Sequence, residues 1–415
     1  MAALAYGPDA VGRHDGRVVF VPGAAPGDRV RVRVVEEHGN WARAALVHVC
    51  VPGPARRAPP CPWVRDCGGC PWQHVDYAAQ LHAKEANVRE SLARIAGVTP
   101  HALAPIQAAP SEWAYRRRIR VHVGAGGVVG YRRPRSHALV PIDECPIAEP
   151  AVAAALAPLR ALVGSLRTTL EDAEIVANGR EALVLAVNAR GAFAAADETA
   201  IRAWLAATPT VAGVALRGRT WTRRFGVTAI ATRSEIDAAP TVQRAGTFTQ
   251  VNPAANLLLV RTVVATVGGG ARVLELFCGA GNLTLPLARV SASVVAVDQN
   301  PRGVEDGAAS AAAAGLANVR FEVAATDEHL RRHGLSGADV VVLDPPRTGA
   351  AAAARLLARL APARIVYVSC DPTTLARDVR TLASAGFAVA RVQPLDMFPQ
   401  GPHVETVLEA VLTAP

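Results

Sequence analysis

Lysine is almost missing from this chain. Of its 44 lysine and arginine residues only Lys84 is a lysine, so arginine carries nearly all of the positive charge behind the formal net charge of +9. Arginine binds phosphates with a forked geometry and stacks on bases, which favours a nucleic-acid partner. A biased genome composition would produce the same preference, and the two explanations carry equal weight at this stage.

Long apolar runs are also absent. No stretch is long enough to span a bilayer, and the N-terminus lacks the basic start and apolar core of a signal peptide. We therefore expect a cytoplasmic protein with no membrane partner, acting as a monomer. In a reducing compartment, the seven cysteines are expected to serve metal binding or catalysis rather than disulfides.

The length of the chain, 415 residues, exceeds what one compact core supports, so we expect several domains. Residues 1–52 predict a small β domain, residues 53–235 a central domain and residues 236–415 an α/β domain. In the first of these, Arg29–Val34 alternates with period two, which places valines on one face and arginines on the other. The arginine face fits either a solvated strand or the phosphate-contacting face of a small oligonucleotide-binding barrel.

Three cysteines lie close together after a proline-rich joint. Cys61, Cys67 and Cys70 can converge on one metal centre, and Cys145 is the best candidate for a fourth ligand. Zinc would favour paired CxxC units or nearby histidines, and only one CxxC is present. Ligation by four cysteines with uneven spacing fits an iron–sulfur cluster at least as well as zinc. Three unrelated thiols are the remaining interpretation.

The central segment begins with a helix and continues with basic strands. Apolar residues on one face predict a helix from Tyr77 to about Ile95, which Gly97 ends. Trp113–Val123 and Tyr131–Arg135 combine arginines with aromatics, as expected for RNA backbone contact and base stacking. An exposed basic hairpin is the alternative. Residues 150–235 predict alternating helices and strands.

From about residue 240 the pattern is α/β. The first five predicted strands alternate with helices, which indicates a mainly parallel sheet with right-handed crossovers, and the short connection between the last two favours an antiparallel edge strand. Ligands of such sheets bind beyond the carboxyl ends of the strands. The predicted strands are Arg272–Phe277, Val294–Asp298, Val319–Val323, Asp339–Asp344, Arg364–Ser369, Phe387–Val392 and His403–Leu412.

A glycine turn and an acidic strand end indicate a nucleoside site. Gly279 and Gly281 follow the first of these strands, but the full GxGxxG pattern of a dinucleotide site is missing. Asp298 ends the next strand, where a carboxylate can bind ribose hydroxyls, and Thr326-Asp327 follows the third. A nucleoside site without a pyrophosphate cradle suggests S-adenosylmethionine.

The fifth strand ends in a cysteine. Cys370 precedes Asp371-Pro372, so the strand breaks there and restarts as a helix, whose N-terminus lowers a thiol pKa. A thiol, the Glu405 carboxylate and a methyl donor in one crevice suit methylation of C5 of uracil, in which the thiolate adds to C6 and a base removes the C5 proton. A buried inert cysteine and an ordinary strand-end carboxylate are the alternatives. The Asp344-Pro-Pro-Arg347 loop ends in arginine, which argues against methylation of exocyclic amines.

Taken together, these motifs resemble those of the bacterial RNA uracil-C5-methyltransferases, most closely the 23S ribosomal RNA branch that has a TRAM domain and a 4Fe-4S cluster. The resemblance covers nearly the whole chain. Its motifs are Phe20–Asp28 of the TRAM core, Cys61–Cys70 with Gln73-His74 of the cluster, Phe248–Asn252 and Leu276–Asn282 of the cofactor site, Val368–Pro372 around the nucleophile and His403–Glu405 around the general base.

The resemblance implies a class I Rossmann-like methyltransferase domain, a TRAM or OB-like β-barrel and an α+β central domain. It also implies that the enzyme makes 5-methyluridine in 23S ribosomal RNA through a covalent adduct between Cys370 and C6, with Glu405 as the base. The implied contacts to S-adenosylmethionine are Gln250, Phe277, Asn282, Asp298, Asp327 and Asp344, and the implied cluster ligands are Cys61, Cys67, Cys70 and Cys145.

Three departures accompany the resemblance. Asp298 stands where the family more often has glutamate, Leu283 stands where an aromatic is common, and the first strand expected upstream of the TRAM pattern is missing. Three other functions stay open. A transfer RNA methyltransferase shares the chemistry but usually lacks the cysteine cluster. An iron–sulfur redox protein would leave Cys370 and Glu405 unexplained, and a catalytically silent RNA-binding protein would leave the nucleophile motif unexplained.

Overall fold

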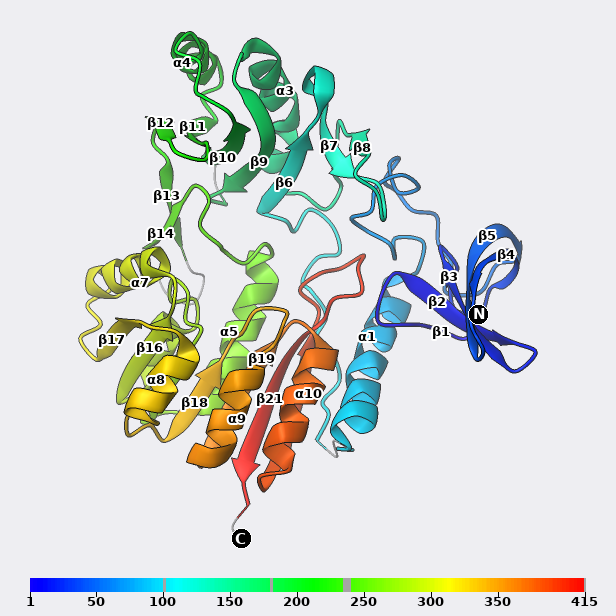
Figure 1. The fold of residues 1–415 in the computed structure, drawn as a ribbon, viewed down its shortest axis with the longest axis vertical. Helices are drawn as coiled ribbons and strands as arrows, with labels where there is room; N and C mark the ends of the chain where they lie inside the picture. The colour runs from blue at the N-terminus through cyan, green and yellow to red at the C-terminus, as the bar shows by residue number, and fades with distance from the viewer. Residues whose placement is uncertain (100–101, 180–181, 234–239, 414–415) are drawn as a thin grey trace.

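The computed structural model describes residues 1–99, 102–179, 182–233 and 240–413. Figure 1 shows a small N-terminal sheet, a central sheet and a C-terminal α/β sheet, arranged around a shared middle region. Among these described residues, no helix is long and apolar enough to cross a membrane.

The N-terminal sheet has five strands in the order β1-β2-β3-β5-β4. Arg29 to Arg33 alternate between exposed arginines and half-buried valines, as the period-two pattern predicts. A domain this small buries little surface alone, and its core is completed by the fully buried Trp72 and Val75 from the following segment. The strands are β1 (Ala3–Leu4), β2 (Asp9–His14), β3 (Arg17–Pro22), β4 (Arg29–Glu37) and β5 (Trp41–Val51).

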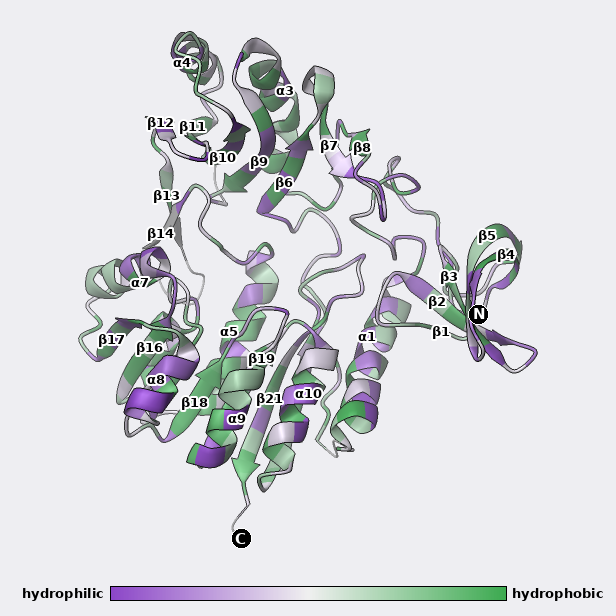
Figure 2. Cartoon of the chain, viewed as in Figure 1, coloured by the Kyte–Doolittle hydropathy of each residue, from purple (hydrophilic) through white to green (hydrophobic). Residues whose placement is uncertain are grey.

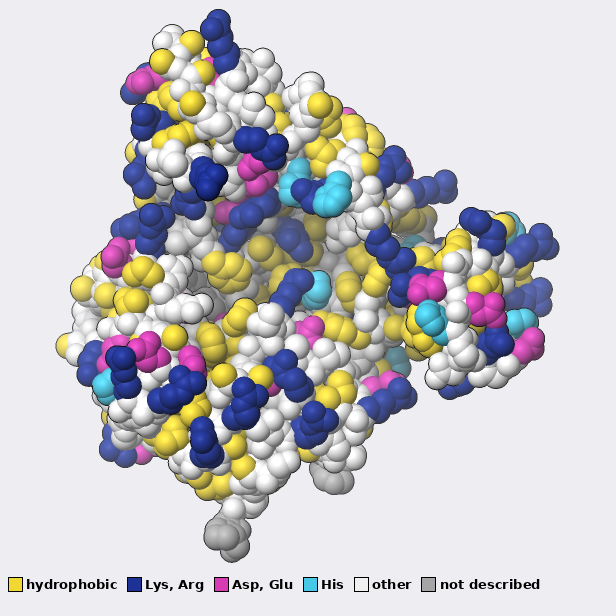
Figure 3. Space-filling model, viewed as in Figure 1, with side chains coloured by type: hydrophobic (Ala, Val, Ile, Leu, Met, Phe, Trp, Pro, Cys, Tyr) yellow, Lys and Arg dark blue, Asp and Glu magenta, His cyan; other side chains and the backbone are white. Residues whose placement is uncertain are grey.

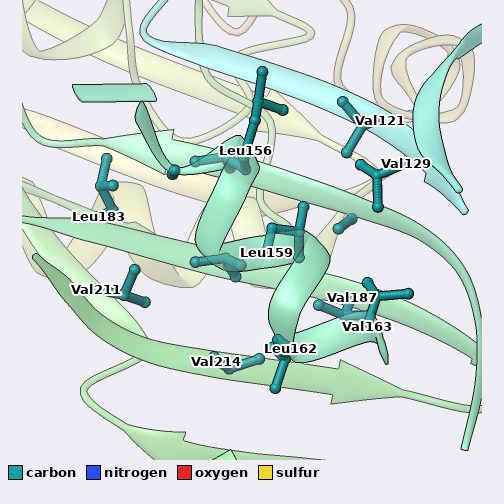
Figure 4. Packing of buried hydrophobic residues seen from close by; sticks show 14 of the residues in the cluster. Val121, Val129, Leu156, Leu159, Leu162, Val163, Leu183, Val187, Val211 and Val214 are labelled. Carbon is teal, nitrogen blue, oxygen red and sulfur yellow. The ribbon is translucent and has the colours of Figure 1, made fainter. Parts of the chain in front are cut away.

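The central sheet has seven strands in the order β12-β11-β10-β9-β6-β7-β8. Its apolar face packs against the helix α3, whose Leu156, Leu159 and Leu162 are buried against strand valines (Figure 4). The strands are β6 (Arg118–Val123), β7 (Val129–Arg132), β8 (Leu139–Pro141), β9 (Thr169–Ala177), β10 (Leu183–Arg190), β11 (Val211–Arg217) and β12 (Thr222–Gly226). The helices are η2 (Ala125–Gly127), α2 (Pro150–Ala154), α3 (Leu156–Ser165) and α4 (Asp197–Ala207), and β13 (Ala229–Arg233) pairs with β14 (Pro240–Arg244).

One helix of the predicted central segment packs against the C-terminal domain instead of the central sheet. Helix α1 (Tyr77–Ser91) continues as one π-helical stretch, η1 (Leu92–Ala96), and ends at Gly97 with a φ of 69°, which confirms the predicted helix. Its Val88 and Leu92 lie in the same apolar cluster as residues of helix α10 in the C-terminal domain. The segment after residue 53 therefore runs along the α/β domain before the central sheet begins.

The C-terminal sheet has the order β17-β16-β15-β18-β19-β21-β20, and its first five strands are parallel, as predicted. The antiparallel strand β21 does not form the edge: it lies between β19 and β20. Figure 2 shows apolar strands covered by helices whose outer faces are polar. The strands are β15 (Arg272–Leu276), β16 (Ser293–Asp298), β17 (Val319–Val323), β18 (Val340–Leu343), β19 (Arg364–Ser369), β20 (Phe387–Leu395) and β21 (Glu405–Leu412). The helices are α5 (Pro253–Val267), α6 (Thr284–Val290), α7 (Pro301–Ala313), α8 (Thr326–His333), α9 (Ala351–Leu360) and α10 (Pro372–Ala383).

Candidate active site

Cys370 lies between a buried strand and a helix N-terminus. Strand β19 ends at Ser369, and Asp371 is the N-cap of α10. The Asp371 carboxylate accepts hydrogen bonds from the backbone N–H groups of Thr373 and Thr374, each at 2.9 Å. This cap, together with Pro372 at the first helical position, stops the strand and starts the helix. The predicted strand–turn–helix arrangement around the cysteine is therefore confirmed.

Glu405 lies at the same end of the sheet. Strand β21 runs antiparallel to β19 with Ser369 opposite Thr406, so the next residues along the two strands are Cys370 and Glu405. The Glu405 side chain is buried, and burial raises its pKa to about 8. The negative charge of Asp344 raises this pKa further, whereas Arg347 lowers it. A carboxyl group of this kind exchanges its proton close to neutral pH.

The thiol shares these neighbours. The pKa of Cys370 is raised to about 12, chiefly by burial and then by Glu405 and Asp344, while Arg347 opposes the shift. The half-buried Asp344 has its own pKa raised to about 7 by burial. Arg347 is thus the cation that favours both the thiolate and the carboxylate forms. Arg347 was not among the predicted site residues, although it ends the Asp344-Pro-Pro-Arg347 loop that follows β18.

The glycine turn after β15 adjoins this group. The backbone N–H of Gly279 donates to Asp298 Oδ2 at 2.9 Å, and Asn300 N–H donates to Oδ1 at 2.8 Å. Phe277 has a φ of +64°, a strained value for a residue with a side chain. Sequence reasoning missed Glu275, which is buried between Asp298 and Asp344. Burial raises its pKa to about 8, and the charges of these two carboxylates add to the shift.

The other predicted cofactor residues surround the same strand ends. Asn282 is exposed and exchanges two hydrogen bonds with Asn256, at 2.8 and 3.0 Å. Asp327 lies in the first turn of α8 and pairs with Arg331 at 2.7 Å. Gln250 is half-buried in the segment that leads into α5.

The loop before Glu405 is held by helix α1. Lys84 Nζ and Asp396 Oδ1 are 2.6 Å apart, and both side chains are fully buried. Lys84 also donates to the Phe398 carbonyl at 3.0 Å, and Gln400 N–H donates to Gln80 Oε1 at 2.9 Å. The one lysine of the chain is therefore a buried structural cation, and the exposed positive side chains are arginines.

The four predicted cluster cysteines line one cavity of about 230 Å³. Burial raises the pKa of each of Cys61, Cys67 and Cys70, that of Cys70 to about 12. The Tyr131 hydroxyl donates to Cys145 Sγ at 3.8 Å. Within the described part of the chain, no group of three or more His, Cys, Asp or Glu side chains is arranged to hold a metal ion.

A larger cavity of about 690 Å³ lies between the central sheet and the start of α7. Figure 3 shows positively charged side chains gathered around the hollow between these two parts. The exposed ring of Phe248 lines the cavity, with the Arg118 guanidinium 5.5 Å from its centre. The arginines that line it are Arg120, Arg217, Arg224, Arg244 and Arg302.

Comparisons with known proteins extend this geometry. Residues 235–411 match the family described as tRNA (Uracil-5-)-methyltransferase, and residues 4–47 match the TRAM domain. A 23S rRNA (uracil(1939)-C(5))-methyltransferase RlmD of Pectobacterium atrosepticum is 35% identical over 96% of this chain and 89% of its own. The chain belongs to the RNA uracil-C5-methyltransferases. It is therefore an S-adenosylmethionine-dependent enzyme.

Two further matches support the assignment to this methyltransferase family. An RlmD of Alkalilimnicola ehrlichii is 37% identical over 98% of this chain and 94% of its own. The solved tRNA (uracil-54, C5)-methyltransferase of Pyrococcus abyssi, in complex with S-adenosyl-L-homocysteine, aligns with a TM-score of 0.77 and 24% identity over 99% of this chain and 100% of its own. At that identity the match concerns the fold, and it confirms the Rossmann-like methyltransferase fold with N-terminal TRAM strands.

Proposed function

We propose that this methyltransferase transfers the methyl group of S-adenosylmethionine to C5 of a uridine in 23S ribosomal RNA, giving 5-methyluridine. The observation that carries the proposal is the pairing of Cys370 with Glu405 at the end of β19 and β21, beside the glycine turn. The RNA target is inferred from the relatives described as 23S rRNA (uracil(1939)-C(5))-methyltransferases. All proposed site residues come from one chain, so a monomer suffices.

The chemistry follows from these side chains. Cys370 Sγ gives its proton to solvent and adds to C6 of the uracil, which makes C5 electron-rich and able to take the methyl group. S-adenosylmethionine would supply that methyl group and leave as S-adenosylhomocysteine. Glu405 then removes the C5 proton, the C5–C6 double bond re-forms, and the bond between C6 and Sγ breaks. Arg347 supports both anions because it lowers the pKa of Cys370 and of Glu405.

The cofactor residues of the proposal lie at neighbouring strand ends. Phe277 and Asp344 follow β15 and β18, and Asp298 ends β16; β15 pairs with both of the other strands in the parallel sheet. Gly279 and Gly281 have φ values of +55° and +89°. The space that a side chain on Gly279 would fill is open, so a ligand can approach the backbone there. We assign the nucleoside and amino acid parts of the cofactor to this turn, with Gln250, Asn282 and Asp327 at its border.

The arginine-lined cavity is the proposed RNA site. A uridine inside folded RNA must leave its stack to reach Cys370. Arginines bind the phosphates on either side of such a base, and the exposed Phe248 ring offers a stacking surface.

The cysteine cavity fits a 4Fe-4S cluster better than one ion. The four thiols line one cavity of about 230 Å³, and a cluster is larger than a single ion. The donor set is thiolate only, as such clusters require. Cys61, Cys67, Cys70 and Cys145 would hold the cluster, which would join the segment before α1 to the central sheet as a structural link.

A transfer RNA substrate is the second candidate, because the description of the matching family names it. The test is methyl transfer from labelled S-adenosylmethionine to unmodified ribosomal RNA and to transfer RNA, followed by nucleoside mass spectrometry and site mapping. 5-Methyluridine at one ribosomal position supports the proposal. Product in transfer RNA alone replaces the substrate but keeps the chemistry, and no product in either RNA overturns the proposal.

A further inference from the structure

A tyrosine of the N-terminal sheet reaches the nucleophile loop. The Tyr6 hydroxyl donates a hydrogen bond to Asp371 Oδ2 at 2.9 Å, between residues that are 365 positions apart in the chain. Tyr6 lies in the short connection between β1 and β2, and its side chain is half-buried. The TRAM domain therefore contacts the residue that directly follows Cys370.

Trp72 links the connection that carries Tyr6 to the loop before Glu405 through two hydrogen bonds. The indole N–H of the fully buried Trp72 donates to the Gly7 carbonyl at 3.0 Å, and the Trp72 backbone N–H donates to the Gln400 carbonyl at 3.1 Å. Gln400 belongs to the loop that leads to Glu405. One tryptophan thus sets the position of Tyr6 relative to the loop of the proposed base.

Tyr6 completes the hydrogen bonding of Asp371. Asp371 Oδ1 accepts from the backbone of Thr373 and Thr374 and from the Thr373 hydroxyl, so this oxygen is committed to the helix cap. Oδ2 accepts from Tyr6. A donor on Oδ2 fixes the rotamer of the carboxylate and withdraws negative charge from it. Because Asp371 adjoins the thiol, both effects act on Cys370.

We infer that Tyr6 is a positioning residue for methyl transfer, which acts on Cys370 through Asp371 and makes the TRAM domain part of the catalytic site. The inference rests on the proposed function, in which Cys370 is the nucleophile. Tyr6 itself contacts neither substrate nor cofactor in this assignment. A TRAM domain that served only to bind RNA would not need this contact.

The decisive variant is Tyr6→Phe, which removes one hydroxyl and keeps the ring. The expected result is a kcat roughly tenfold lower, with KM for RNA and for S-adenosylmethionine changed by less than about twofold. The matched control is Ser165→Ala in helix α3, which also removes one part-buried hydroxyl, here donating to the Leu162 carbonyl at 2.8 Å. An unchanged kcat in Tyr6→Phe, or an equal loss in the control, overturns the inference.

A second readout needs no RNA. Iodoacetamide alkylation of the Cys370 peptide, followed by mass spectrometry across pH, reports the reactivity of the thiol directly. The charged groups that act on this thiol are Glu405, Arg347, Asp344 and Asp371. Tyr6→Phe should move the alkylation profile to higher pH, because the carboxylate of Asp371 then keeps its full charge. An unshifted profile contradicts the inference even if the uridine substrate proves to be wrong.

A double-mutant cycle tests the route through Asp371. If Tyr6 acts through this carboxylate, adding Tyr6→Phe to Asp371→Asn should cost less than twofold in kcat, although the same change costs roughly tenfold in the wild-type enzyme. Independent, multiplying losses would show that Tyr6 acts by another route and would overturn the inference.

Discussion

The molecule holds cysteines in two contrasting settings. Burial raises the pKa of Cys70 and of Cys370 to about 12 in both cases. Around Cys70 the neighbours are Gln73, other thiols and an arginine, whereas Cys370 adjoins two carboxyl groups that exchange protons near neutral pH. The pKa of a thiol therefore does not reveal its role, and the acids and bases beside it do. Each of the following predictions tests that contrast.

The largest effect is expected from Cys370→Ala. Without the thiol no adduct forms, so methyl transfer should fall by about 10⁴-fold or more while cofactor binding stays intact. Transfer of a labelled methyl group measures the activity, and calorimetry measures the binding of the cofactor. Cys50→Ala is the matched control, since Cys50 is exposed on strand β5 and has no part in the proposed cluster or catalytic site. Substantial turnover by Cys370→Ala would contradict the proposed mechanism.

Glu405→Gln should slow the reaction after the adduct has formed. The amide keeps the shape of the side chain but cannot take the C5 proton, so turnover should drop by about 10² to 10⁴-fold. A covalent complex of enzyme and RNA should then accumulate, visible as a shifted band after denaturing electrophoresis. A variant that turns over slowly without any accumulated adduct would show that Glu405 acts earlier.

Cys70→Ser should affect stability more than chemistry. Loss of one cluster ligand should remove bound iron and lower the Tm by roughly 5 °C or more, because the cluster would no longer join its two segments. Methyl transfer by the fraction that remains folded should fall less than about tenfold. Intact folding and RNA binding together with abolished methyl transfer would contradict a structural role.

The smallest effect concerns pH. Because burial raises the pKa of Glu405 to about 8 and the base must be deprotonated, kcat should rise with pH through that region. Arg347→Gln removes the charge that lowers this pKa, so the midpoint should move upward by about half a unit to one unit, given the exposure of the arginine. An unchanged midpoint of the pH profile would show that Arg347 does not act on the base.

Sequence patterns predicted much of this architecture. The observed bounds of Val319–Val323 and Arg364–Ser369 equal the predicted ones. Arg364–Ser369 contains a continuous apolar run, as expected of a buried parallel strand, whereas Val319–Val323 alternates apolar and charged residues and forms an edge of the sheet. The predicted antiparallel pairing at the edge of the sheet is confirmed for β20 and β21, but the pattern did not indicate that β21 lies inside and β20 at the edge. The periodicity of a strand indicates which of its faces is buried, but not which strands it pairs with.

The candidate site shows the same limit. The predicted strand ends placed Cys370, Asp298 and Asp344 at one edge of the sheet before the structure was known. The contact between Tyr6 and Asp371 could not be foreseen, because it depends on how two separate sheets dock. Glu275 was overlooked because a glutamate in an apolar strand gives no sign of its neighbours, and the structure alone shows the two carboxylates beside it.

The inner position of β21 has a consequence for synthesis of the protein on the ribosome. Strands β19 and β20 leave the ribosome before β21. The position between them in the sheet stays unfilled until β21, the last strand of the described chain, is synthesised with Glu405 at its start. A nascent or prematurely terminated chain therefore has a nucleophile but no base, and it presents two unpaired strand edges that favour aggregation. Catalysis can therefore begin only after β21 has been synthesised and has inserted between β19 and β20.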